Sequence, residues 1–85
     1  MRIVDPSMLD QPLINAFGKR IRTLRTARGL SQEQLAELTG FHRTYIGMIE
    51  RGERNPSLSN VGVFARSFQL SLSELLEFGM KRGER

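Results

Sequence analysis

The residues best suited to recognition chemistry lie together in the segment GFHRTYIGMIERGERNPSL, which covers residues 40–58. This segment contains the only histidine and the only tyrosine of the chain, with Arg43 and Thr44 close to its start. Arginine offers two parallel donors to guanine O6 and N7, and threonine places a hydroxyl or a methyl group against a base edge. The combination is typical of a surface that reads DNA bases.

The sequence lacks the groups that catalysis or metal binding would require. The chain has no cysteine, and His42 is its single histidine, so no His/Cys ligand set can form. It also offers no nucleophile–base pair and no glycine-rich phosphate loop. We therefore expect a protein that is not an enzyme, with no catalytic residue, no metal, no cofactor and no small-molecule ligand.

Helical periodicity predicts which residues of the segment face outward. At about 100° per residue, a helix over residues 43–51 turns Ile46 and Ile49 to one side, which must face the core. We expect the opposite side to contact DNA bases, and it carries Arg43, Thr44, Gly47 and Met48. Alternatively, Arg43 is a solvated surface arginine or contacts a phosphate, Thr44 contacts a phosphate, and Met48 folds back over the edge of the core.

Gly47 is the unusual member of this outward side. A glycine inside a helix costs roughly 1 kcal/mol relative to alanine. Its missing side chain would let the helix backbone approach the floor of the groove, or would give Arg43 and Met48 room to spread. The alternative is that the helix merely tolerates a poor helix former.

Other polar residues are expected to contact the DNA backbone. Gln32 is placed at the start of the preceding helix, where free backbone N–H groups favour phosphate. The complete set of expected backbone contacts is Gln32, Tyr45, Arg51, Arg54 and Asn55. For the arginines the alternative is an ordinary solvated surface, and for Tyr45 it is packing against the core.

The elements that must position these side chains are short helices. Apolar residues at three- and four-residue spacing, together with Ser–x–x–Gln and Ser–x–x–Glu capping boxes, predict a chain without strands. The expected helices occupy residues 13–28, 31–40, 43–51, 57–68 and 71–79. Leu38 and Leu58 are assigned to the apolar sides of their helices. We expect a flexible arm over residues 1–12, the domain over 13–79 and a charged tail over 80–85.

The stretch SQEQLAELTGFHRTYIGMIERGERNPSL resembles the helix-turn-helix family of phage Cro and repressor proteins. Within that family, the Arg43–Ile46 and Ile49–Arg51 stretches, followed by Arg54 and Asn55, resemble the controller proteins of restriction–modification systems. The resemblance implies a compact, all-α, five-helix lambda-repressor-like domain. Its second and third helices would form the helix-turn-helix, and the third would enter the major groove of double-stranded DNA.

The resemblance also implies an ion pair between Arg25 and Glu50, which would tie the first helix to the recognition helix. Such proteins usually bind near-palindromic operators as homodimers. We expect the dimer surface on the C-terminal helix, where Leu76 and Phe78 could leave apolar area uncovered. The alternative is that Phe78 covers the core of its own domain. Gln69 stands where the family often has glycine.

Length and charge agree with this interpretation. The chain has 85 residues, a net charge of +4 and a pI of about 10.7, which suit one domain with an anionic partner. The first residues form no apolar signal core, and no run is long enough to cross a membrane. We therefore expect a cytoplasmic transcriptional regulator, acting as repressor or activator. The alternative function is an antitoxin that binds a protein toxin and represses its own operon.

Overall fold

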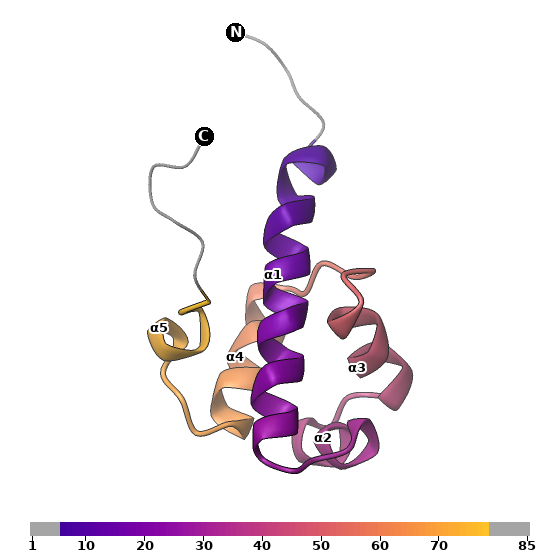
Figure 1. The fold of residues 1–85 in the computed structure, drawn as a ribbon, viewed down its shortest axis with the longest axis vertical. Helices are drawn as coiled ribbons and strands as arrows, with labels where there is room; N and C mark the ends of the chain where they lie inside the picture. The colour runs from indigo at the N-terminus through magenta and orange to yellow at the C-terminus, as the bar shows by residue number, and fades with distance from the viewer. Residues whose placement is uncertain (1–5, 79–85) are drawn as a thin grey trace, which may run out of the picture.

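The computed structural model describes residues 6–78, and this part of the chain folds into helices without strands. The helices are α1 (Pro6–Ala27), α2 (Gln32–Thr39), α3 (Arg43–Glu50), α4 (Leu58–Ser67) and α5 (Leu72–Leu75). In Figure 1, α1 stands in the middle with α3 on one side and α4 and α5 on the other. This arrangement confirms the expected all-α, five-helix fold.

The core lies where the apolar sides of the helices meet. Aromatic rings link three parts of the chain, because the Phe64 ring of α4 lies 5.9 Å from that of Phe17 and 5.2 Å from that of Phe41. The buried apolar residues are Phe17, Ile21, Leu35, Ala36, Ile46, Ile49, Val61, Phe64, Ala65, Phe68 and Leu75. Every helix therefore contributes at least one side chain to a single core.

Two leucines that the spacing assigned to the apolar sides face solvent instead. Leu38 is 56% exposed and Leu58 is 77% exposed. Leu38 lies in the last turn of α2 and Leu58 is the first residue of α4. Because both helices are short, their terminal turns extend past the edge of the core, so helical spacing alone assigned these two residues wrongly.

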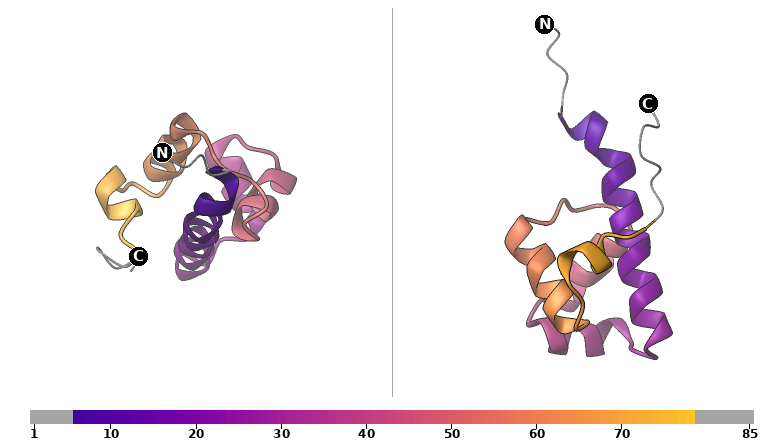
Figure 2. Two further views of the ribbon diagram at one scale, coloured as in Figure 1. Left: turned by 90° about the horizontal axis from the view of Figure 1, so that it is seen from above. Right: turned by 90° about the vertical axis from the view of Figure 1, so that its left-hand side faces the viewer.

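The first helix begins earlier than expected. α1 starts at Pro6, so the part of the expected arm over residues 6–12 is helical, while residues 1–5 lie outside the described residues. Proline suits the first position of a helix because its missing N–H has no partner there. Gln11 Nε2 also donates to Gly52 O (2.9 Å) and to Asn15 Oδ1 (2.8 Å), which fixes the added turns to the domain. The N-terminal end of α1 extends past the other helices in Figure 1 and in the right-hand view of Figure 2.

The last helix is shorter than expected, since α5 covers Leu72–Leu75 and Gly79 lies outside the described residues. The predicted capping box is present, with Ser71 Oγ accepting from the N–H of Glu74. Hydrogen bonds from Ser71 lower the pKa of the Glu74 carboxyl. Arg20 of α1 donates to the carbonyl oxygens of Leu75 (3.0 Å) and Glu74 (2.7 Å) and so holds α5 against α1.

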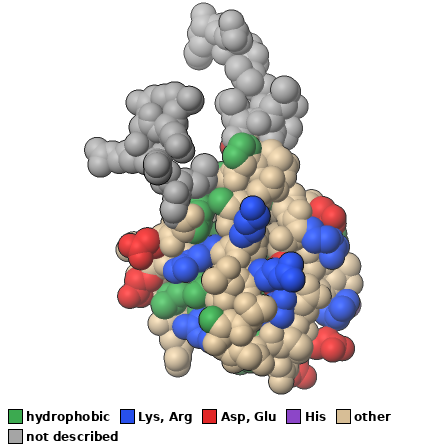
Figure 3. Space-filling model, viewed as in Figure 1, with side chains coloured by type: hydrophobic (Ala, Val, Ile, Leu, Met, Phe, Trp, Pro, Cys, Tyr) green, Lys and Arg blue, Asp and Glu red, His purple; other side chains and the backbone are tan. Residues whose placement is uncertain are grey.

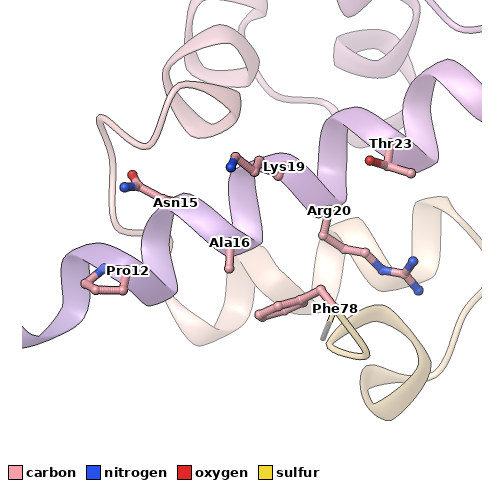
Figure 4. Close-up of a pocket in the computed structure, with 7 residues that line it drawn as sticks. All are labelled: Pro12, Asn15, Ala16, Lys19, Arg20, Thr23 and Phe78. Carbon is pink, nitrogen blue, oxygen red and sulfur yellow. The ribbon is translucent and has the colours of Figure 1, made fainter. Parts of the chain in front are cut away.

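The concave features are open grooves. One groove of about 460 Å³ lies along α1. Figure 4 shows side chains that line it, among them Lys19 and Arg20 of α1 and Phe78. Within residues 6–78, no group of three or more His, Cys, Asp or Glu side chains is placed to hold a metal ion. A search of the same residues for a helix long and apolar enough to cross a membrane found none.

Candidate nucleic-acid interface

The helices α2 and α3 are joined by a tight turn that presents α3 on the surface. Gly40 ends α2 with a φ of 82°, a left-handed conformation that glycine adopts without strain. His42 precedes α3 and makes no side-chain capping hydrogen bond, as expected for imidazole. Ile46 and Ile49 are buried, which fixes the rotation of α3 about its axis.

This rotation exposes the side of α3 that was expected to contact bases. Arg43 and Thr44 are exposed and Met48 is half-buried. Gly47 lies on the same row as Arg43 but is itself buried. A Cβ atom at Gly47 would lie 3.0 Å from Nη1 of Arg51. The Arg51 side chain therefore lies over Gly47, which the sequence did not predict.

The expected ion pair between α1 and α3 is present and largely shielded from solvent. Arg25 Nε donates to Glu50 Oε2 (2.6 Å) and Arg25 Nη2 donates to Glu50 Oε1 (3.0 Å). The side chains are 12% and 4% exposed, respectively. Hydrogen bonding to Glu50 raises the pKa of Arg25, and Arg25 Nη1 also donates to Leu30 O (2.9 Å). The pair holds the recognition helix at a fixed angle to α1.

A close approach of α1 to α3 reinforces this geometry. A Cβ atom at Gly18 would overlap the carbonyl oxygen of Ile49 and lie 2.9 Å from that of Glu50. No residue larger than glycine therefore fits between the two helices at this point. This close approach was not predicted from the sequence, although Gly18 lies inside a predicted amphipathic helix, where a glycine was the available signal.

Tyr45 and Arg54 form a second cluster beside α3. The Tyr45 hydroxyl accepts a hydrogen bond from Asn60 Nδ2 (3.0 Å), and its ring packs on Phe41 with centroids 4.9 Å apart. The Arg54 guanidinium lies 5.6 Å from the centre of the Tyr45 ring. Because the hydroxyl hydrogen remains available, Tyr45 and Arg54 can both donate to one stretch of phosphates.

Gln32 and Asn55 lie in different surroundings. Gln32 Nε2 donates to Glu50 Oε1 (3.1 Å), so its amide supports the ion pair and keeps one further hydrogen for another acceptor. Asn55 is exposed in the loop between α3 and α4. Both residues were expected to contact phosphates, and the hydrogen bond from Gln32 to Glu50 was not predicted.

Charge is distributed unevenly over the face that presents α1 and α3. Figure 3 shows Lys and Arg side chains across the middle and right of this face, with most acidic side chains toward its edges. Arg51 is paired with Glu53, and hydrogen bonding to Arg51 lowers the pKa of the Glu53 carboxyl. Clustered basic groups beside an exposed helix form an electrostatic surface suited to a polyanion.

Comparison with protein families gives one match. The model of the family described as helix-turn-helix matches residues 21–75, which include all of α2, α3 and α4. Control protein C.SmaI of Serratia marcescens is 48% identical over 60 residues, which cover 71% of this chain and 71% of that protein.

Solved structures give the same result. The restriction–modification controller protein C.AhdI of Aeromonas hydrophila superposes with a TM-score of 0.70 at 50% identity, covering 73% of this chain and 94% of that one. The controller protein C.Esp1396I, solved as a tetramer with its natural 35 base-pair operator, superposes with a TM-score of 0.68 at 30% identity. That match covers 75% of this chain and 88% of the other.

Proposed function

The chain belongs to the helix-turn-helix family, and on that premise we propose that it is a sequence-specific regulator of transcription that binds double-stranded DNA. Its similarity to controller proteins of restriction–modification systems favours the control of genes in such a system. The recognition helix is α3, which enters the major groove with its outward side against the base edges.

One observation carries this proposal: α3 exposes Arg43 and Thr44 while it buries Ile46 and Ile49. The exposed side offers hydrogen-bond donors of the kind that major-groove base edges accept. The buried side and the Arg25–Glu50 pair keep the helix rigid on the domain. Rigid presentation lowers the free energy that would otherwise be spent on ordering these side chains when DNA binds.

A single domain of this size contacts too few bases to select one operator in a genome. We propose that two copies bind together, each in one half-site, with centres about 34 Å apart. An apolar groove of about 520 Å³ supplies a surface for pairing, with Leu13, Leu58 and Leu76 exposed around it. This surface includes the expected C-terminal segment and extends over α1 and the start of α4.

The decisive experiment is selection of bound sequences from a pool of random double-stranded DNA by the purified protein. We expect a near-palindromic motif with half-sites one helical turn apart. Recovery of sequences without any shared motif would contradict the proposal. If the protein selects no DNA motif and copurifies with a small toxin, the antitoxin function is supported instead.

A further inference from the structure

The position of the Arg51 side chain is the feature of α3 that the family resemblance leaves unexplained. Arg43, Gly47 and Arg51 follow one another at four-residue spacing, so they form one row along the outward side of the helix. Long side chains in helices point back toward the N-terminus. The guanidinium of Arg51 accordingly lies over Gly47, with Nη1 at 3.0 Å from the position of a Cβ atom there.

Glu53 holds this guanidinium by one edge only. Arg51 Nε donates to Glu53 Oε2 (3.0 Å) and Arg51 Nη2 donates to Glu53 Oε1 (3.2 Å). A guanidinium has five N–H donors, so both hydrogens on Nη1 and one on Nη2 remain. Within residues 6–78, Nη1 has no hydrogen-bond partner. The free end of Arg51 is therefore a two-nitrogen donor fork of the shape that binds guanine O6 and N7.

The backbone after α3 places the Glu53 carboxylate beside Nε and Nη2 of Arg51. Gly52 has a φ of 74°, its N–H bonds to Ile49 O (3.1 Å), and the N–H of Glu53 bonds to Met48 O (2.8 Å). These two bonds form a Schellman motif, which sets the direction of the chain after the helix. Gly52 is buried against Asn15 of α1, so the turn is fixed to the domain.

We propose that Arg51 reads a base edge through its Nη1–Nη2 end, and that Gly47 and Glu53 are positioning residues for it. The inference rests on the proposed function and assigns to Arg51 a specificity role in place of the expected backbone contact. The charge balance favours a base over a phosphate. The Glu53 carboxylate neutralises the Arg51 cation and would repel a phosphate, whereas O6 and N7 of guanine carry no net charge.

The first test compares Arg51→Ala with the wild-type protein on its selected site, on single-base variants of that site and on random DNA. We expect the preference at one base pair in each half-site to fall by about 10-fold or more. Affinity for random DNA should fall by a much smaller factor, because the Glu53 carboxylate is left without its counter-charge. Equal losses on specific and random DNA, with a flatter salt dependence, would overturn the proposal in favour of a phosphate contact.

Glu53→Gln tests the role of the carboxylate. Removing its charge frees the Arg51 cation for phosphates, so affinity for random DNA should rise and the salt dependence should steepen by about one unit. Preference at the Arg51 base pair should weaken at the same time. Unchanged random-DNA affinity and unchanged preference would show that Glu53 does not position Arg51.

Gly47→Ala tests whether the open space at Gly47 positions the Arg51 guanidinium, because the new methyl group would displace Arg51 Nη1. We expect loss of preference at the same base pair as in Arg51→Ala. Gly62→Ala is the matched control, since a Cβ atom there also faces an arginine but lies at an ordinary contact distance, 3.5 Å from Nη1 of Arg66 on α4. This control should bind DNA as the wild type does.

The double variant Gly47→Ala/Arg51→Ala distinguishes two roles for Gly47. In one, Gly47 positions the Arg51 side chain; in the other, it lets the backbone of α3 approach the floor of the DNA groove. If Gly47 acts through Arg51, the double variant binds as Arg51→Ala does. Additive losses would overturn the positioning role of Gly47. Failure of the proposed function has a different result: the wild-type protein would then select no motif, and no base pair could be assigned to any variant.

Discussion

At the scale of single residues, the Arg25–Glu50 pair determines how α3 is held. Three hydrogen bonds meet at the Glu50 carboxylate, from Arg25 Nε, Arg25 Nη2 and Gln32 Nε2. A nearly buried charge with this many partners costs much more when one partner is lost than the pair itself contributes. The pair therefore fixes the position of α3 relative to α1, and it does not itself contact bases.

Glu50→Gln should destabilise the fold by about 3 kcal/mol, because the Arg25 guanidinium would remain buried without its counter-charge. The measurement is urea denaturation followed by circular dichroism. Glu53→Gln is the control, because Glu53 is 53% exposed and its loss should leave the free energy of unfolding unchanged. Equal stabilities of the two variants would show that the Arg25–Glu50 pair does not hold the fold.

Arg43→Ala should weaken binding to the selected operator by about 1–3 kcal/mol and relax the preference at one base pair. The physical reason is the loss of a bidentate contact from an exposed guanidinium at the start of α3. Arg54→Ala should instead weaken operator and random DNA alike and flatten the salt dependence by about one unit. Titrations of both variants at several salt concentrations distinguish the two roles, and identical profiles would contradict the assignment.

At the scale of elements, the turn between α4 and α5 carries backbone strain. Gln69 has a φ of 59°, and it is the one non-glycine residue with a positive φ in the described part of the chain. The family resemblance had marked this position as one where glycine is usual. A residue with a Cβ atom therefore occupies a left-handed conformation at this turn.

Gln69→Gly should stabilise the protein by about 1 kcal/mol, because glycine adopts the left-handed conformation without a Cβ clash. The reciprocal variant Gly40→Gln should destabilise by a similar amount, since Gly40 has a φ of 82° and open space around its Cβ position. Thermal unfolding measures both. Changes of the same sign in the two variants would show that backbone conformation is not the cause.

At the scale of the whole molecule, exposed leucines gather around one apolar groove, which is the candidate surface for pairing. Leu13 and Leu76 are 50% and 43% exposed beside the apolar groove, where Leu58 is 77% exposed. Clustered apolar residues of this kind mark contact surfaces on small proteins. The grouping favours a homodimer formed through α1, α4 and the segment after α5.

Leu58→Glu should convert dimers into monomers and lower operator affinity, because a charge would be buried against the second copy. The side chain is too exposed for this change to unfold the domain. Leu38→Glu is the control, since Leu38 is 56% exposed on α2 and does not line the groove. Sedimentation velocity measures both variants, and a dimeric Leu58→Glu protein would exclude this surface.

The sequence by itself determined the helices and the side of α3 that faces outward. Periodicity, serine caps and terminal glycines are local signals, and Ile46 and Ile49 left one orientation for the recognition helix. The resemblance then supplied the Arg25–Glu50 pair, since its partners are far apart along the chain. Local patterns were weaker at helix ends, where α1 began earlier, α5 ended sooner, and Leu38 and Leu58 faced solvent.

Only the tertiary structure decided how α1 and the loop after α3 shape the interface. The close approach at Gly18, the bond from Gln11 to Gly52 and the support of Glu50 by Gln32 all join residues distant in sequence. The placement of Arg51 over Gly47 depends on a rotamer and on the Schellman turn that carries Glu53. Periodicity specifies which side of a helix a residue occupies, but the path of a long side chain is set by the partners that three-dimensional packing brings to it.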